Sequence, residues 1–172
     1  MSKVLLVVAP ERFRDEEFLV PRAALAEAGA RVAVASTRPG RARGMLGAEV
    51  AVDLLVSEAN PADYDAVVVV GGFGSPTHLW GHEPLLELVK TMYGEGKVVA
   101  GICFSGAVLA RAGVLAGKRA TVFPAPHAMV ELQRGGAHYV EEAVVRDGTV
   151  LTASGPEAAQ AFAKALVRQL PV

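Results

Sequence analysis

The chain has little of several things that particular classes of protein require. Its single cysteine, Cys103, excludes an internal disulfide and any metal site made of several thiolates. Aromatic residues make up only 6% of the 172 residues and the formal net charge is −1, which argues against a nucleic-acid-binding surface. No apolar run approaches the ~20 residues of a membrane-spanning helix, and the first residues carry no signal-peptide cleavage site. We therefore expect a cytoplasmic protein without nucleic-acid or membrane partners.

Hydrophobic residues, by contrast, are abundant. They make up 52% of the chain, against 20% for charged residues, and the mean hydropathy is +0.34. This composition is too apolar for a disordered chain and is sufficient for a packed core. The length is that of one ordinary domain, and we expect a single domain over residues 1–172.

Short apolar runs alternate with helix-like segments along the chain. Strands are predicted at residues 3–8, 31–35, 49–52, 65–70, 97–102, 119–123, 139–145 and 149–152. Helices are predicted at residues 11–28, 83–95, 105–112, 126–134 and 157–169, with a loop at residues 39–47. This order predicts an α/β fold, a doubly wound and mainly parallel sheet covered by helices. Ligands of such sheets bind beyond the carboxyl ends of the strands, here residues 9–17, 71–77, 103–106 and 123–127.

Cys103 stands at one of these strand ends. A lone cysteine is more often an inert small hydrophobe than a nucleophile. Here, however, the thiol lies between a buried strand and a predicted helix, with Gly101 and Gly106 leaving room for a tight turn, which is the arrangement of a nucleophile elbow. Unpaired N–H groups and the dipole at a helix N-terminus favour thiolate over thiol. We therefore predict that Cys103 is an ionised nucleophile.

A glycine-rich turn, Gly71-Gly72-Phe73-Gly74, follows another buried strand. A phosphate-binding loop is a weak interpretation, because the third glycine of that motif is missing and Pro76 removes a backbone donor. The N–H groups of Gly72 and Phe104 could instead form an oxyanion hole beside the thiol. The remaining interpretation is a turn that requires glycine for its positive φ.

Several motifs in a fixed order carry a resemblance to a known family. They are Asp15-Glu16-Glu17-Phe18 after the first strand, Gly71-Gly72, Gly101-Ile102-Cys103, Ala112-Gly113-Val114-Leu115-Ala116-Gly117-Lys118, and Ser154-Gly155-Pro156. In this order they resemble the ThiJ/PfpI superfamily of DJ-1-like proteins over essentially the whole chain. The resemblance implies a flavodoxin-like, three-layer α/β/α fold of the class I glutamine amidotransferase type. It also implies a homodimer or hexamer, and we expect no cofactor.

The resemblance assigns a role to Glu17. This residue stands where the family has a carboxylate that hydrogen-bonds the elbow cysteine. To donate to a thiolate, Glu17 would have to be protonated, with its pKa raised by burial and by the neighbouring negative charge. The alternative is a solvated charge in the first turn of a helix, the interpretation that we give to Asp15 and Glu16.

The sequence departs from the family at its histidines. PfpI-type proteases have His directly after the cysteine, where this chain has Phe104, and a Glu from a neighbouring subunit near the position of Thr77. The DJ-1-like branch has a His-Pro pair where this chain has Phe123-Pro124. We predict His127 first and His78 second as a replacement imidazole, with a surface histidine as the alternative. Zinc is not expected, because no two histidines have the spacing of ligands.

Three functions remain open. The first is a cysteine-dependent enzyme, in which Cys103 attacks an electrophilic carbon, Glu17 moves protons, and Gly72 and Phe104 hold the oxyanion. Its substrate would be a small reactive carbonyl compound or its adduct, as for a glyoxalase or deglycase, or a peptide, as for an intracellular protease. The second is a redox-sensing or stress-response protein, chaperone-like and without turnover. The third is a degenerate member of the family. For subunit contacts, the candidates are Leu79 and Trp80, with a core position for Trp80 as the alternative.

Overall fold

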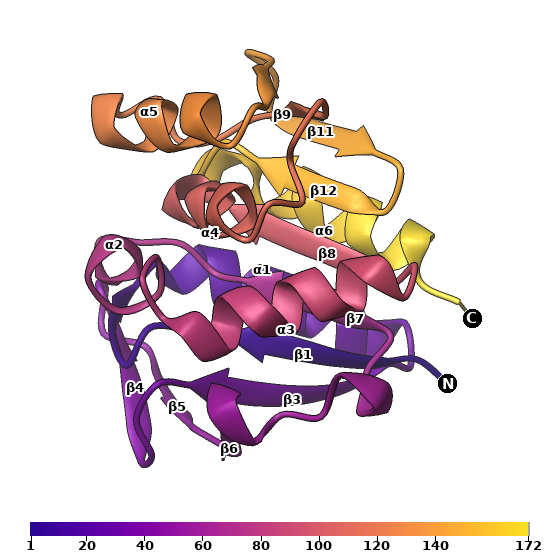
Figure 1. Cartoon of the computed structure of the whole chain (residues 1–172). Helices are drawn as coiled ribbons and strands as arrows, with labels where there is room; N and C mark the ends of the chain where they lie inside the picture. Colours follow the sequence, from indigo (N-terminus) through magenta and orange to yellow (C-terminus); the bar gives the residue numbers. More distant parts are fainter. Residues whose placement is uncertain (172) are drawn as a thin grey trace.

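The structure, a computed structural model, describes residues 1–171 and is built on one seven-stranded sheet. Its strand order is β11-β12-β8-β7-β1-β3-β6 (Figure 1). The strands are β1 (Lys3–Val7), β3 (Arg31–Ser36), β6 (Leu54–Leu55), β7 (Ala66–Val69), β8 (Val98–Ile102), β11 (Val144–Asp147) and β12 (Val150–Ala153). All neighbours in the sheet are parallel except β11 and β12, which form an antiparallel hairpin. The predicted parallel sheet and terminal hairpin are confirmed.

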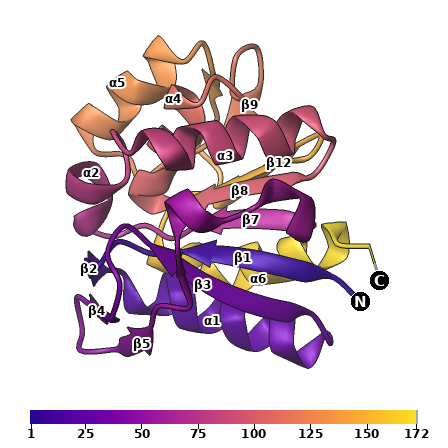
Figure 2. The same ribbon diagram turned by 60° about the horizontal axis from the view of Figure 1, so that its bottom comes forward.

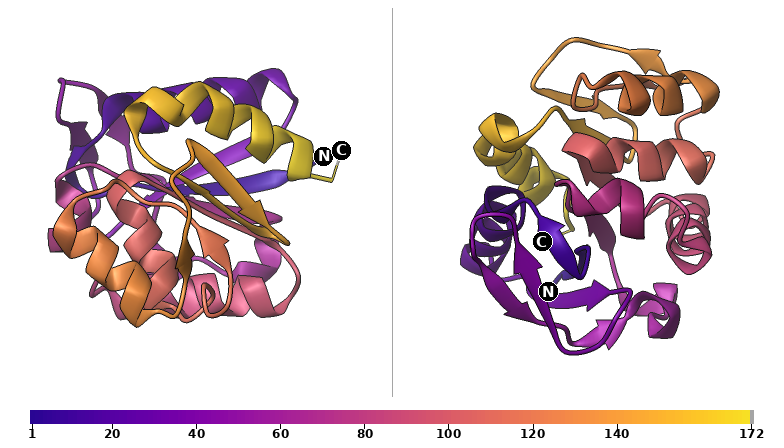
Figure 3. Two further views of the ribbon diagram at one scale, coloured as in Figure 1. Left: turned by 90° about the horizontal axis from the view of Figure 1, so that it is seen from above. Right: turned by 90° about the vertical axis from the view of Figure 1, so that its left-hand side faces the viewer.

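Helices cover both faces of the sheet. On one face lie α1 (Asp15–Glu27) and α6 (Ala159–Gln169), which contact each other; on the other lie α3 (Glu83–Gly94) and α4 (Gly106–Arg111) (Figures 2 and 3). The central strands β1, β7 and β8 are almost wholly buried, as expected of strands that are apolar on both faces. The chain therefore has the expected flavodoxin-like, three-layer α/β/α fold.

Smaller elements lie at the carboxyl end of the sheet and along its β11 edge. They are β2 (Glu11–Phe13), β4 (Arg41–Gly44), β5 (Glu49–Ala51), β9 (Arg119–Ala120), β10 (His138–Tyr139), α2 (Gly74–His78) and α5 (Pro126–Arg134). Short 3-10 turns are η1 (Val56–Glu58), η2 (Pro61–Asp63), η3 (Cys103–Ser105) and η4 (Pro156–Ala158). Strands β2, β4 and β5 form one small sheet, and β9 and β10 form another.

The strand predicted at residues 139–145 is divided between β10 and β11, and the strand predicted at residues 119–123 ends at Ala120. Two other predicted segments take a different structure. Residues 11–13 form strand β2 instead of opening a helix, because they pair with β4 and bury the side chain of Phe13 completely. The predicted loop at residues 39–47 contains β4, which pairs with both β2 and β5. In both cases long-range pairing overrides a local pattern rich in charge and glycine. None of the helices in residues 1–171 has the length and apolarity needed to cross a bilayer.

Candidate active site

Cys103 occupies a sharp turn at the carboxyl end of β8. The strand ends at Ile102, Cys103 begins the 3-10 turn η3, and helix α4 follows at Gly106. The φ of Cys103 is 61°, in the left-handed region that costs a residue with a side chain of the order of 1–3 kcal/mol. The thiol side chain is only 4% exposed. The strand, sharp turn and helix predicted around Cys103 are confirmed.

Gly71 brings Glu17 and Cys103 together. Glu17 lies in the first turn of α1 and is completely buried. A Cβ atom placed on Gly71 would lie 2.5 Å from Oε1 of Glu17 and 2.7 Å from Cβ of Cys103. Both distances are shorter than van der Waals contact, so the two residues occupy the space beside Gly71 that any larger residue would fill. Glu17 is therefore not the solvated charge of the alternative interpretation.

Burial controls the protonation of Glu17. Desolvation raises the pKa of the carboxyl to about 8, while hydrogen bonding by the Cys103 thiol and the Gly71 backbone lowers it. Neither carboxyl oxygen has a hydrogen-bond partner of regular geometry among residues 1–171. The direction of the shift agrees with the expected rise, with burial rather than Cys103 as its cause, and it places the pKa of Glu17 close to neutral pH.

The thiol differs from expectation in the direction of its pKa shift. Burial raises the pKa of Cys103 and the charge of Glu17 raises it further, while N–H groups of Phe104 and Gly72 lower it by hydrogen bonding to the sulfur. This direction runs against the prediction that the helix N-terminus and the neighbouring carboxyl keep Cys103 ionised. The physical reason for the raised pKa is that desolvating a buried thiolate costs more free energy than two N–H donors return. The nearby carboxylate of Glu17 adds electrostatic repulsion. The site therefore holds a buried thiol beside a buried carboxyl, and the pKa of each group is raised.

The glycine-rich turn approaches the same sulfur. Gly72 has a φ of +108°, and a Cβ on it would lie 2.4 Å from the backbone nitrogen of Arg14. The position therefore requires glycine for its conformation and for its close packing, as one interpretation of the sequence predicted. The N–H groups of Gly72 and Phe104 lie close enough to the sulfur of Cys103 to lower its pKa. The oxyanion-hole interpretation stays a prediction, because it requires these donors to reach a substrate oxygen rather than the sulfur.

A small cavity opens onto Cys103. Its volume is about 80 Å³, and it is lined by Arg14, Met45, Gly72, Phe73, Cys103, Phe104, Phe123 and Pro156. Arg14 is the one charged residue in this lining, and its guanidinium is held by Glu16 through bonds of 3.0 and 2.9 Å. Neither Arg14 nor Met45 is among the predicted site residues. Arg14 does fall within the strand-end segment at residues 9–17, which was the available signal.

Among the described residues, 1–171, no histidine lines the cavity at Cys103. His127 packs with its ring centroid 5.2 Å from Phe104 and 5.4 Å from Trp80. His78 lies 3.6 Å from a carboxyl oxygen of Glu11. Burial lowers the pKa of His82, whose Nε2 has no hydrogen-bond partner among residues 1–171. The structure therefore places no predicted imidazole in the lining around the thiol; His127 instead supports the ring of Phe104.

Two further predictions need correction. Asp15 is buried rather than solvated, because its carboxylate accepts hydrogen bonds from the N–H groups of Leu46 and Ala48 at 2.9 and 2.8 Å. Leu79 and Trp80 are not surface contacts, since they are 0% and 5% exposed. Trp80 takes the core position that was its alternative, and its indole N–H donates to the carbonyl of Phe104 at 2.9 Å. Both interactions stabilise segments that line the cavity.

The chain resembles proteins of known family in sequence and in structure. MJ0967 of Methanocaldococcus jannaschii is 50% identical over 161 residues, which cover 94% of this chain and 78% of that protein. A protein of Pyrococcus abyssi named deglycase PYRAB04690 is 35% identical over 96% of this chain and 98% of its own length. The crystal structure of a ThiJ/PfpI domain protein from Brachyspira murdochii has a TM-score of 0.90 and 36% identity, covering 96% of this chain and 94% of that one. Residues 2–169 match the sequence pattern of the DJ-1/PfpI family, and the chain belongs to that family.

Proposed function

We propose that this protein is a cysteine-dependent enzyme of the glyoxalase or deglycase type, acting on small 2-oxoaldehydes or on the adducts that they form with amines. The observation that carries the proposal is the pairing of the buried carboxyl of Glu17 with the thiol of Cys103. A relative 35% identical to this chain is named a deglycase, which supports the same reaction class.

The raised pKa values indicate how the pair would work. With its pKa raised to about 8, Glu17 is partly ionised near neutral pH, while the pKa of Cys103 lies above its ordinary value. A proton acceptor with a pKa close to the working pH is effective in general-base catalysis. We therefore assign to Glu17 the removal of the thiol proton as the sulfur attacks, instead of the stabilisation of a standing thiolate.

The reaction on a 2-oxoaldehyde can be written with these groups. The sulfur of Cys103 forms a bond to the aldehyde carbon, the thiol proton passes to Glu17, and the N–H groups of Gly72 and Phe104 hold the oxyanion. Return of the proton to that oxygen gives a hemithioacetal. The hydrogen on the former aldehyde carbon then moves, as a proton, to the adjacent carbonyl carbon, and the hydroxyl proton moves to the adjacent oxygen, which gives a 2-hydroxyacyl thioester. Water hydrolyses the thioester to a 2-hydroxy acid and regenerates the thiol. One carbon is oxidised as its neighbour is reduced, so no external oxidant is needed.

The cavity favours this reaction over peptide cleavage. A space of about 80 Å³ next to the thiol fits a group of a few carbon atoms. Cleavage of a peptide also requires an acid that protonates the leaving amine. Phe104 stands directly after the cysteine, and no histidine lines the cavity, so the imidazole that could supply that proton has no counterpart beside Cys103.

The burial of Cys103 also argues against a redox sensor without turnover. Sensor cysteines have low pKa values and accessible thiolates. Cys103 is 4% exposed, and burial raises its pKa. Peroxide titration followed by intact mass tests this alternative: a thiol that stays unmodified at modest peroxide excludes it, and ready conversion to sulfinic acid would support it.

The direct test is lactate formation from methylglyoxal. We expect Cys103→Ser to abolish turnover and Glu17→Gln to reduce it by about 100-fold or more. Glu27→Gln serves as a matched control, because Glu27 lies on the same helix α1 and is exposed. Activity of the wild-type protein that persists in Cys103→Ser would overturn the proposal, as would the absence of any turnover by wild type.

We also infer that the protein assembles as a homodimer or hexamer in the cytoplasm. Phe73 and Phe123 line the mouth of the cavity and are 58% and 38% exposed, which is unusual for aromatic side chains that sit side by side with Phe104. Association that covers these rings would enclose the site. Light scattering distinguishes the expected oligomer from a monomer.

A further inference from the structure

Ser105 is bonded to both ends of the glycine-rich turn through one hydroxyl group. The turn, residues 71–74, runs between Val70, directly after β7, and Ser75 in α2. Oγ of Ser105 donates to the carbonyl of Val70 at 2.7 Å, and it lies 2.7 Å from Oγ of Ser75. Since the single hydroxyl proton of Ser105 goes to the carbonyl, Ser75 is the donor in the second bond. The residue before the turn and the residue after it are thus tied to the same atom of the elbow.

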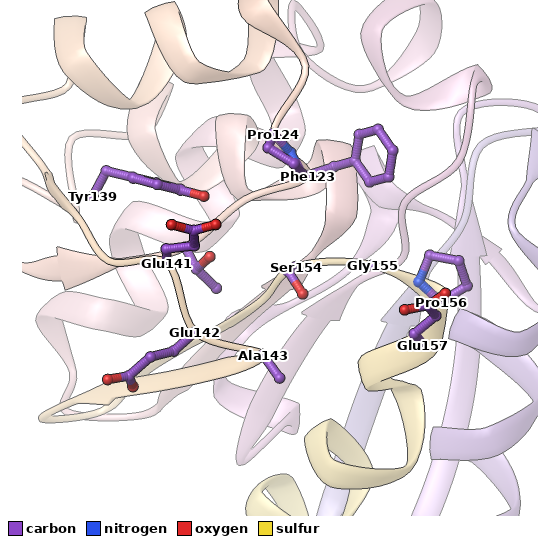
Figure 4. Close-up of a pocket in the computed structure, with 11 residues that line it drawn as sticks. Phe123, Pro124, Tyr139, Glu141, Glu142, Ala143, Ser154, Gly155, Pro156 and Glu157 are labelled. Atoms are coloured by element: carbon purple, nitrogen blue, oxygen red, sulfur yellow. The ribbon is translucent and has the colours of Figure 1, made fainter.

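Neither serine is placed to contact a substrate. Both are completely buried, and among residues 1–171 neither lines the thiol cavity. That cavity shares Phe123 and Pro156 with a larger cavity of about 480 Å³, whose lining is shown in Figure 4 and also excludes both serines. A role of Ser105 or Ser75 in a reaction at Cys103 would therefore act through the residues that they hold.

The glycine-rich turn depends on contacts from outside, because it has little stiffness of its own. Three of its four residues are glycine, the residue with the greatest conformational freedom. On the side of α1, the N–H of Arg14 donates to the carbonyl of Gly71 at 3.0 Å. On the side of the elbow, Ser105 supplies its two bonds. Loss of the Ser105 hydroxyl would leave the turn attached to α1 but less fixed relative to Cys103.

The position of this turn matters for the sulfur. The N–H of Gly72 lowers the pKa of Cys103 by hydrogen bonding, against the larger effect of burial. In the proposed reaction the same N–H, together with that of Phe104, holds the oxyanion. Phe104 directly precedes Ser105 in the chain. The Ser105 hydroxyl therefore links the two segments that carry these donors.

We propose that Ser105 is a positioning residue of this site, whose buried hydroxyl holds the N–H of Gly72 at a fixed place relative to Cys103 and Phe104. The catalytic consequence rests on the proposed function, whereas the effect on the thiol does not. Removing the hydroxyl should leave the cavity lining and Glu17 in place while it withdraws one donor from the sulfur and from the oxyanion.

Ionisation of Cys103 tests this role without turnover. The measurement is thiolate absorbance at 240 nm against pH for the full-length wild type and Ser105→Ala, with the absorbance of Cys103→Ala subtracted to remove the tyrosines. Because the chain has one cysteine, the difference reports on Cys103 alone. We expect the thiolate of Ser105→Ala to form at higher pH and to be about threefold scarcer than in the wild type below the midpoint, because a thiolate that loses an N–H donor is less stable. A curve that coincides with the wild type, or lies at lower pH, overturns the proposal.

Ser36→Ala is the matched control. Ser36 is completely buried, and its Oγ donates to the carbonyl of Val8, directly after β1, at 2.7 Å. The variant therefore loses a buried bond of the same kind, at the end of another central strand, that does not involve the glycine-rich turn. We expect its thiolate curve to match the wild type, and urea denaturation to show that both variants are folded. A shift in Ser36→Ala equal to that in Ser105→Ala would indicate a general loosening and overturn the assignment.

Ser75→Ala is a second variant that removes only one of the two bonds. Within residues 1–171, Ser105 is the hydrogen-bond partner of the Ser75 hydroxyl, so this change should shift the curve in the same direction but by less. The two changes combined should shift it no further than Ser105→Ala alone, because they remove a shared link. Fully additive shifts contradict that link. Should Ser105→Ala fail to fold, a Ser75→Ala curve identical to the wild type overturns the proposal.

Turnover tests the catalytic part separately. We expect Ser105→Ala to lower kcat for methylglyoxal about tenfold and to change KM by less than about twofold, since the donor acts on charge that develops in the transition state. A shifted thiolate curve without any turnover by the wild type would contradict the proposed function and keep Ser105 as a positioning residue. Turnover that requires Cys103, with the thiolate curve unchanged in Ser105→Ala, would keep the proposed function and overturn this role. A shifted curve with unchanged kcat overturns the catalytic part.

Discussion

The carboxyl of Glu17 and the thiol of Cys103 meet in the space that Gly71 leaves open. A Cβ on Gly71 would lie 2.5 Å from Oε1 of Glu17 and 2.7 Å from Cβ of Cys103. The two groups come from different elements, helix α1 and the turn after β8, and a third element, the end of β7, allows them to approach. The chemistry proposed for the site depends on this approach.

Gly71→Ala should therefore disrupt the site more than its single methyl group suggests. The added carbon must displace the carboxyl of Glu17, the elbow of Cys103 or both, and overpacking of a buried region costs about 1–3 kcal/mol. We expect a lower free energy of unfolding by that amount and loss of turnover. Urea denaturation and lactate formation measure the two effects. Gly81→Ala is the matched control, since nothing lies within 4 Å of a Cβ there; a Gly71 variant as stable and active as this control contradicts the account.

Glu17→Gln should lower the pKa of Cys103 relative to the wild-type protein. The negative charge of Glu17 raises the pKa of the thiol, and glutamine carries no charge, while burial of the sulfur remains. Because the chain has one cysteine, thiolate absorbance at 240 nm and alkylation by iodoacetamide report on Cys103 alone. We expect the pH at which the absorbance and the alkylation rate increase to be lower in the variant than in the wild type. A shift of this pH to a higher value would show that Glu17 favours the thiolate, as the sequence alone suggested.

The buried carboxyl should also make stability depend on pH. Burial raises the pKa of Glu17 from about 4.5 to about 8 in the folded protein, so the folded state binds this proton more tightly than the unfolded chain. The stability due to this proton is fully present below about pH 4.5 and is lost as the pH rises through about 8. Between pH 5 and pH 9, we expect the free energy of unfolding of the wild type to fall relative to Glu17→Gln by roughly 3–5 kcal/mol. Urea titrations of both proteins across this pH range measure the effect. A difference in free energy of unfolding that stays constant from pH 5 to pH 9 would contradict the prediction.

Asp15→Asn should loosen the loop that carries Met45. Both carboxylate oxygens of Asp15 accept backbone N–H groups of this loop, from Leu46 and Ala48, and an asparagine side chain accepts through one oxygen only. The loss of one such bond in a buried position costs about 1–3 kcal/mol. We expect faster hydrogen exchange at Leu46 and Ala48, with protection in β1 and β8 changed little. Unchanged exchange at these two amides would show that the loop is held by other contacts.

The features of the site that could be predicted from the sequence are those that a local pattern determines. The strand, sharp turn and helix around Cys103 lie within a few consecutive residues, and the parallel sheet brings strand ends to one edge, so the elbow and its neighbours Gly72 and Phe104 could be predicted. Glu17 was assigned by resemblance, because one carboxylate among three in a row looks the same as its neighbours.

The features that the sequence did not reveal depend on distant contacts. Asp15 is buried because residues 46 and 48 fold over it, and Arg14 reaches the cavity because α1 begins beside Gly72. The direction of the Cys103 pKa depends on the depth of burial, which a motif does not encode. His127 was expected near the thiol from its position after Phe123, but its ring stacks on Phe104 instead.

The dependence of methylglyoxal turnover on pH tests the central claim most directly, because Glu17 must be ionised to accept the thiol proton. For the wild type, we predict a rate that rises with pH through about 8, the value to which burial raises the pKa of Glu17. In Glu17→Gln that step should be absent, and the residual rate should follow the ionisation of Cys103. A wild-type rate that is flat across this range, or a step that persists in Glu17→Gln, would contradict the role assigned to the carboxyl.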